Sequence, residues 1–168
     1  PLNFRRWSKL TPSAYLQESL DKTKHIARYN VTESNDELIP VLITLDAKGE
    51  YGAVYGLGVD DLALPDAIRR VLVEEEPDSY IFVVECWVTQ FKDAAAAVEG
   101  RVSDMPLDDR REVVQIIGVE KGNPETLTYL ASIKNNGDGS RSLGDWERAD
   151  TEWGPSLAGE DSFLTLDW

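Results

Sequence analysis

Glu85 is the residue whose type and position are best suited to acid–base chemistry. It lies within an apolar run, between Val84 and Cys86. If the surrounding surface is covered, burial would disfavour the charged form of its carboxyl group, as at many general acids and bases. Glu85 is therefore the candidate catalytic residue. Because side chains alternate along a strand, it shares its face with Ile81, Val83, Trp87 and Thr89.

Two other interpretations of Glu85 stay open. Its carboxylate would lie on a solvated face of a sheet, or it would pair with an arginine such as Arg110 or Arg111. In the catalytic interpretation, the partner carboxylate is an aspartate of the segment 92–109. One carboxyl group would then act as acid and the other as base, which is the arrangement of a small hydrolase or isomerase.

Three aspartates gather at the end of that segment, Asp104, Asp108 and Asp109, and Glu112 lies just beyond it. Their oxygens are the ligands that a hard cation prefers. Acidic loops are more often simply solvated, so we assign no metal site to them.

Metal and cofactor chemistry has little support among the nitrogen and sulfur ligands. His25 and Cys86 are the only histidine and cysteine, so no recurring zinc, haem or iron–sulfur motif is present. Cys86 lies in an apolar strand and is expected to be a buried, inert thiol rather than a reactive one. His25 lies beside Lys24 and Arg28 and is expected at the surface. We predict no cofactor.

Two segments resemble known binding loops only in part. Residues 134–140 (KNNGDGS) resemble a calcium loop, but Lys134 would occupy the first ligand position, so a hairpin turn fits better. Gly56-Leu57-Gly58 lacks the third glycine of a dinucleotide fingerprint, and Asp60-Asp61 would repel a phosphate. No GxSxG, SxxK, HExxH or P-loop pattern occurs.

The charge balance excludes several classes of partner. The chain has 17 basic and 31 acidic residues, a net charge of −14. Binding to nucleic acids or anionic membranes needs clustered Lys and Arg, so neither is expected as a partner. The acidity fits simple solubility, a basic protein partner or a high-salt cytoplasm. The longest apolar stretch, 80–84, is too short to cross a bilayer, and the lone cysteine favours a reducing cytoplasm.

Periodicity and turn residues predict the elements that must position these residues. Thr11 and Pro12 are typical of a helix start, and apolar spacing predicts a helix over 12–28. A second helix begins at Pro65 and ends at the acidic run 74–76. The segment 80–91 is apolar on both faces, which predicts a central strand, and 92–109 is expected to be a long loop. The other predicted strands are 38–45, 51–57, 111–120, 126–134 and 141–148.

Short turns between consecutive strands predict antiparallel pairing. We therefore expect an α+β domain over residues 1–150, with a mostly antiparallel sheet of five or six strands and both helices packed on one face. The order is helix, two strands, helix, then three or four strands.

Residues 151–168 form an acidic segment that carries Trp153, Phe163 and Trp168 without a clear period. We expect these aromatic residues to bind a protein partner or a second copy of the chain. The sequence thus favours a non-enzymatic protein-interaction or accessory module. The alternative is the carboxylate-dependent hydrolase or isomerase built on Glu85.

Overall fold

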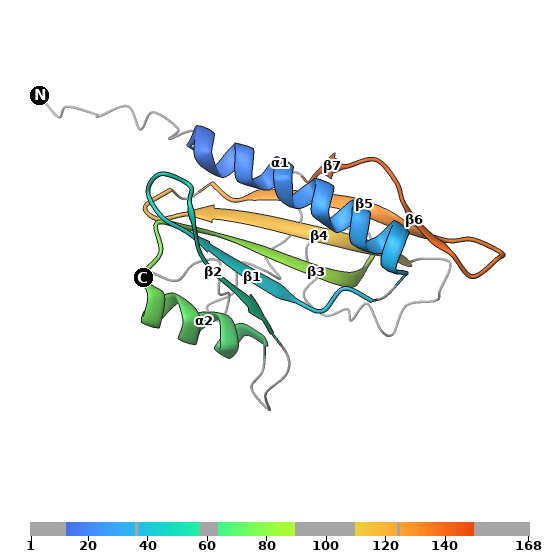
Figure 1. Ribbon diagram of the computed structural model, residues 1–168, viewed down its shortest axis with the longest axis horizontal. Helices are drawn as coiled ribbons and strands as arrows, with labels where there is room; N and C mark the ends of the chain where they lie inside the picture. The colour runs from blue at the N-terminus through green and yellow to red at the C-terminus, as the bar shows by residue number, and fades with distance from the viewer. Residues whose placement is uncertain (1–12, 36, 58–63, 90–109, 124, 150–168) are drawn as a thin grey trace, which may run out of the picture.

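The computed structural model describes residues 13–35, 37–57, 64–89, 110–123 and 125–149. Two α-helices, a short π-helical turn and seven strands make up these residues (Figure 1). In chain order they are α1 (Ala14–Tyr29), η1 (Asn30–Ser34), β1 (Val41–Leu45), β2 (Tyr51–Gly56), α2 (Leu64–Glu75), β3 (Ser79–Thr89), β4 (Arg110–Glu120), β5 (Leu127–Asn135), β6 (Arg141–Leu143) and β7 (Glu147–Arg148). Among them, no helix is long and apolar enough to span a membrane.

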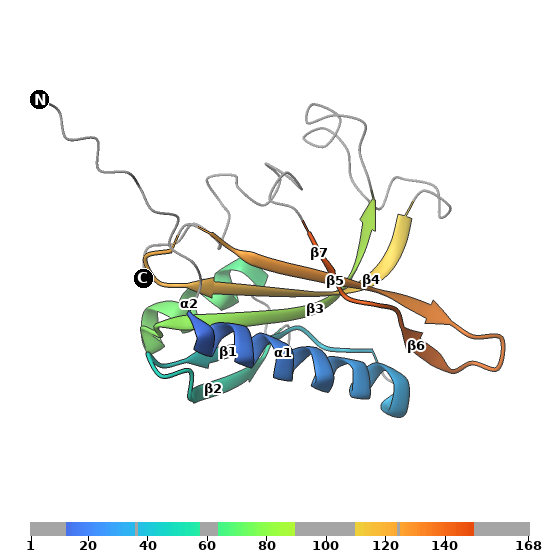
Figure 2. The same cartoon turned by 90° about the horizontal axis from the view of Figure 1, so that it is seen from above.

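The strands form one antiparallel sheet in the order β2-β1-β3-β4-β5-β6, and β7 pairs with β5 beside β6. The α+β class, the antiparallel pairing and the predicted element order are confirmed. β3 lies inside the sheet, between β1 and β4, as its two apolar faces predict. The sheet curls, as the view from above shows (Figure 2).

The two helices pack against opposite faces of the sheet (Figure 2). Ile81 and Val83 of β3 pack with α1, whereas Tyr80 and Phe82 pack with α2. We expected both helices on one face, but in the structure they lie on opposite faces. The reason is that β3 is apolar on both faces, so each face needs a cover of its own.

α1 begins two residues after the expected position. Ser13 is the N-cap, and its side chain accepts a hydrogen bond from the backbone N–H of Leu16 at 3.3 Å. The Ser13 N–H donates to Oε2 of Glu120 at 2.9 Å, which fixes the helix start to the end of β4. Thr11 and Pro12, the predicted start, lie outside the described residues.

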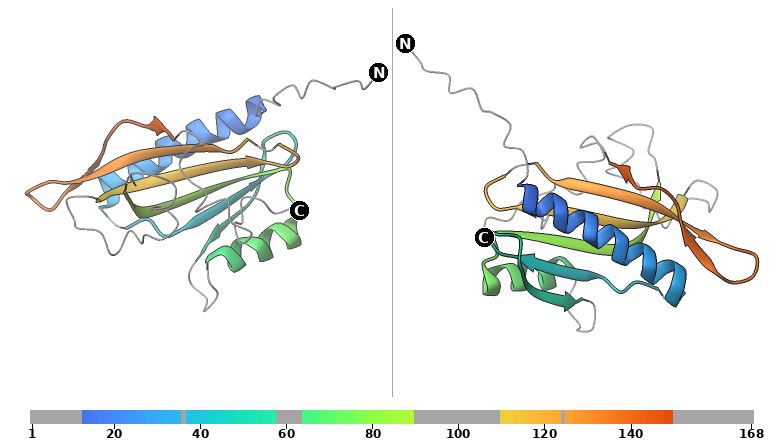
Figure 3. Two further views of the ribbon diagram at one scale, coloured as in Figure 1. Left: turned by 180° about the vertical axis from the view of Figure 1, so that it is seen from behind. Right: turned by 45° about the horizontal axis from the view of Figure 1, so that its top comes forward.

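The predicted hairpin of β1 and β2 is confirmed. Asp46 accepts backbone hydrogen bonds from Lys48 and Glu50, and Gly49 takes the positive φ of 75° that the turn requires. Figure 3 shows α1 running beside this hairpin. A Cβ atom at Gly49 would lie 2.5 Å from Cβ of Tyr15, so the turn can approach the helix only because residue 49 is glycine.

Candidate functional site

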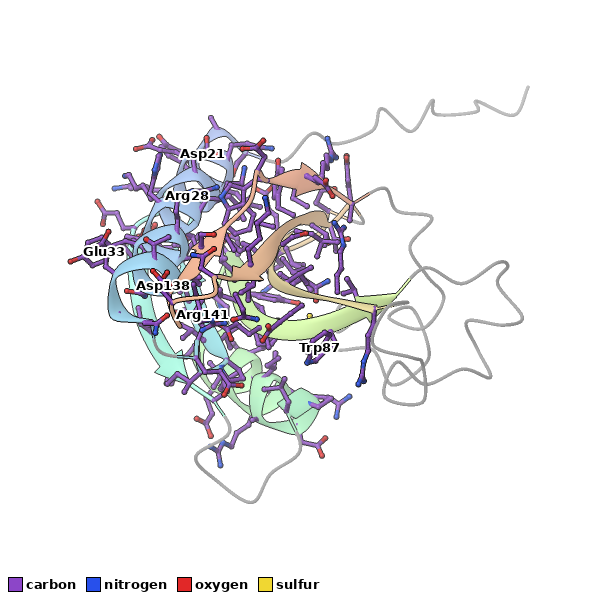
Figure 4. The ribbon with its side chains drawn as sticks, turned by 90° about the vertical axis from the view of Figure 1, so that its right-hand side faces the viewer. Asp21, Arg28, Glu33, Trp87, Asp138 and Arg141 are labelled. Atoms are coloured by element: carbon purple, nitrogen blue, oxygen red, sulfur yellow. The ribbon has the colours of Figure 1, made fainter. Side chains whose placement is uncertain are left out.

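Glu85 lies on the α1 side of β3, beyond Ile81 and Val83. Its side chain is only 3% exposed, so the solvated-face interpretation is wrong. Its Oε2 accepts a hydrogen bond from Nη2 of Arg141 at 2.8 Å. The carboxylate is thus part of a buried ion pair, although its partner is neither Arg110 nor Arg111. Figure 4 shows Arg141 and its surroundings.

The two arginines named from the sequence have other partners. The Arg110 guanidinium lies over the ring of Trp87, 5.1 Å from the ring centroid. Arg111 donates to Oγ of Ser132 at 3.0 Å and to Oε2 of Glu147 at 3.1 Å. Arg111 is on the α2 side of β4, opposite Val88, so it faces away from Glu85.

Arg141 gathers a second carboxylate beside Glu85. Its Nη2 lies 3.9 Å from Oε1 of Glu112, whose other oxygen accepts a 3.4 Å hydrogen bond from Asn135. The pKa of Arg141 is raised, first by the hydrogen bond to Glu85 and to a lesser degree by the charges of Glu112 and Glu37. The guanidinium of Arg141 thus interacts with three carboxylates, those of Glu85, Glu112 and Glu37.

Local structure at both ends of β6 positions Arg141. In the hairpin between β5 and β6, the N–H of Asn136 donates to the carbonyl of Ser140 and the N–H of Gly139, which adopts a φ of 84°, donates to the carbonyl of Asn136. This confirms that residues 134–140 form a hairpin turn. Beyond Arg141, Arg28 of α1 donates to the backbone carbonyls of Leu143 and Gly144, at 2.5 and 2.7 Å.

The second oxygen of Glu85, Oε1, is buried and has no hydrogen-bond partner among the residues that the structure describes. Oε2 is bonded to Arg141, and the side chain as a whole is 3% exposed, so neither oxygen faces solvent. A substrate would therefore have no access to this carboxylate in the described part of the chain. Asp104, Asp108 and Asp109, the possible second carboxylates, lie outside that part.

Cys86 lies on the α2 side of β3, and its thiol is 3.8 Å from Oε1 of Gln115. Burial raises the pKa of this thiol from 9.0 to about 11. This fits the expected inert thiol, because the thiolate is the reactive species. His25 is exposed, and the described residues contain no group of three or more metal-binding side chains.

The Cys86 pKa predicts a loss of stability in alkali. The folded chain holds the thiol proton more tightly than the unfolded chain, so the protonated thiol contributes to the free energy of unfolding. This contribution is complete below pH 9 and is lost as pH rises to about 11. Between pH 8 and 10.5 the free energy of unfolding should fall by about 2 kcal/mol through Cys86. Urea unfolding at the two pH values checks this. Cys86→Ala should show a dependence weaker by that amount, and equal dependences would contradict it.

A second feature is a set of exposed apolar side chains shared by α1, β2 and the segment before β1. One flank of α1 faces β5 and β6, because Lys24 lies 3.5 Å from the ring centroid of Tyr129 in β5 and Arg28 donates to the carbonyl of Leu143 in β6. The opposite flank faces the β1–β2 hairpin. We call the exposed apolar residues there the α1–β2 strip: Tyr15, Ile26, Ile39, Tyr51 and Val54, each 49–63% exposed.

Contacts place Tyr15 and Ile39 at the two ends of β2. Tyr15 lies against Gly49, two residues before Tyr51. Ile39 lies against Gly56 at the other end of β2, because a Cβ there would be 3.1 Å from Cδ1 of Ile39. Lys22, on the same flank of α1, is bound to Glu18. This hydrogen bond is the main reason that the pKa of Lys22 is raised, and Tyr51 makes a smaller contribution.

β2 is also an edge strand. Its sequence, YGAVYG, has no charged residue and no proline. The N–H of Leu57 donates to the carbonyl of Pro40, so alternation turns the backbone groups of Tyr55 and Ala53 toward β1. The N–H groups of Val54 and Gly56 therefore point away from the sheet. The sequence predicted this strand but not its edge position, which depends on the strand order.

The residues expected to bind partners, Trp153, Phe163 and Trp168, lie outside the described residues. Comparisons with protein-family models, curated proteins and solved structures found no match for the chain.

Proposed function

We propose that this chain is a non-enzymatic protein-interaction module that binds an extended segment of a partner along β2. The observation that carries the proposal is the uncharged edge strand beside the exposed α1–β2 strip. A partner strand would bond to the outward N–H groups of Val54 and Gly56. Its side chains would cover the apolar residues of the strip.

The composition of β2 supports this proposal. Exposed edge strands usually carry lysine, proline or inward charges that prevent pairing with other chains. β2 has none of these over six residues, although the bulge opposite Thr44 and Leu45 is another feature that can protect an edge. Main-chain hydrogen bonds to such an edge provide affinity, while side chains on the neighbouring surface provide specificity. Each large apolar side chain that becomes fully buried adds about 1.5–3 kcal/mol.

The charges around β2 indicate the chemistry of the partner. Glu50 directly precedes the strand, Lys48 lies in the same turn, and Glu18 on the neighbouring flank of α1 is bound to Lys22. On the α2 side, Glu75 accepts a 2.5 Å hydrogen bond from Tyr55. With a chain charge of −14, a segment that carries lysine or arginine beside apolar side chains fits best.

The catalytic alternative has no specific observation in its favour. It needs Glu85 to meet a substrate and a second carboxylate. Glu85 is 3% exposed and bonded to Arg141, and the nearby carboxylate, Glu112, lies 3.9 Å from the same guanidinium nitrogen. This arrangement supports a structural role for Glu85.

A lysine at Val54 should block the interaction. Val54 is 63% exposed, so the change leaves the core intact and places a charge on the strip. Val73→Lys is the matched control, because Val73 is 64% exposed but lies on α2. Partners retained by the native chain in cell extract would be identified by mass spectrometry and purified. Their dissociation constants would then be measured by calorimetry.

We expect Val54→Lys to weaken binding of the purified partner by about tenfold or more, equivalent to 1.4 kcal/mol, with Val73→Lys within about twofold of the native chain. Equal effects of the two variants would place the interaction elsewhere. The absence of any partner sensitive to Val54→Lys would overturn the proposal.

A further inference from the structure

We propose that residues 1–12 of the same chain pair antiparallel with β2 and cover the α1–β2 strip in the free protein. This inference rests on the proposed function, because it names the segment that a partner would have to displace. It makes β2 a regulated docking edge.

The position of the chain at residue 13 supports this occupant. Ser13 is fixed to Glu120, and Tyr15 lies against Gly49 in the turn that leads into β2. Residues 1–12 therefore join the domain beside the start of β2. A segment that runs along β2 and then enters α1 must travel from Gly56 toward Tyr51, which is the antiparallel direction.

The length of the segment is sufficient. Twelve extended residues span up to about 40 Å, whereas the six residues of β2 span about 20 Å. The segment can therefore pair over the whole strand and still leave several residues for the connection to α1. Prolines occur only at its ends, Pro1 and Pro12, so its interior N–H groups can all donate.

Charge selects this segment over the other possible occupants. It carries Arg5, Arg6 and Lys9 and no acid, whereas the rest of the chain carries 14 basic and 31 acidic residues. The segment 151–168 carries four acidic residues and no basic one, and a second copy of the chain has the same charge of −14. Both would be repelled where residues 1–12 are attracted. The apolar residues available to cover the strip are Leu2, Phe4, Trp7 and Leu10.

The test is residue-resolved amide hydrogen exchange in the full chain, measured by NMR. The N–H groups of Val54 and Gly56 point outward from β2, so only an added strand can protect them. The variant Arg5→Glu/Arg6→Glu reverses two charges of the segment. Lys134→Glu/Arg148→Glu is the matched control, with the same change in net charge at two exposed residues distant from β2 in the sheet order.

We expect protected Val54 and Gly56 amides in the native chain and at least about tenfold faster exchange in Arg5→Glu/Arg6→Glu. The control variant should stay within about twofold of the native chain. The Tyr55 amide, which points toward β1, should stay protected throughout and report an intact sheet.

Three outcomes would overturn the inference. Fast exchange at Val54 and Gly56 in the native chain would show an open edge. Protection that grows with protein concentration would assign the edge to a second copy. Protection that survives in Arg5→Glu/Arg6→Glu but is lost on deletion of 151–168 would assign it to the C-terminal segment. The proposed function could still hold in the first case, since the Val54→Lys binding test is independent of residues 1–12.

Discussion

Arg141→Met should lower the free energy of unfolding by about 3–5 kcal/mol, because it leaves a buried carboxylate without its countercharge. Glu85 is 3% exposed, and Arg141 is its hydrogen-bond partner among the described residues. Methionine fills much of the volume of the arginine side chain, so the loss reports the charge rather than a cavity. Urea unfolding at pH 7 measures it.

Two further variants separate this effect from ordinary surface electrostatics. Arg111→Met removes an ion pair to Glu147 whose arginine is 41% exposed, and it should cost less than about 1 kcal/mol. Glu85→Gln/Arg141→Met removes both buried charges, so it should recover most of the loss seen in Arg141→Met. A loss below about 1 kcal/mol in Arg141→Met would mean that Glu85 has another source of compensation.

Glu85→Gln by itself distinguishes the two interpretations of this residue. If the ion pair is structural, the change breaks it and lowers stability. A gain of about 1 kcal/mol or more would instead show that an unfavourable carboxylate is retained, which would favour a catalytic role.

The sequence was sufficient to predict both α-helices and the strands up to β5, because each has a local signal. It did not predict η1, and it predicted one strand over 141–148 where the structure has β6 and β7. The helical spacing of Leu16, Leu20 and Ala27 and the turn around Gly49 depend only on neighbouring residues. The pairing of Glu85 with Arg141 does not. The two residues are 56 positions apart, on strands separated by β4 and β5. In a flat sheet these strands would lie roughly 14 Å apart, so the contact depends on the curl of the sheet.

The placement of the helices shows a related limit. The sequence indicated that β3 is apolar on both faces, and the structure covers one face with α1 and the other with α2. Helical periodicity identifies the apolar side of a helix but not the face of the sheet that receives it. That choice is made by the connections between elements and by the approach of particular side chains, such as Leu20 to Gly118.

Leu20→Ala should lower the free energy of unfolding by about 3 kcal/mol, because Leu20 is fully buried where α1 meets β4. Gly118 makes this contact possible: a Cβ there would lie 2.9 and 3.0 Å from Cδ1 and Cδ2 of Leu20. Gly118→Ala should therefore cost about 1–3 kcal/mol by itself through overpacking. In Leu20→Ala/Gly118→Ala the added methyl group enters the space that leucine leaves, so the combined loss should be smaller than the sum by about 1 kcal/mol or more.

Ile26→Ala, on the exposed flank of the same helix, is the control and should cost less than about 1 kcal/mol, since Ile26 is 55% exposed. Chemical denaturation of the native chain, the two single variants and the double variant provides the double-mutant cycle. Strict additivity would show that α1 does not pack on β4 through this pair.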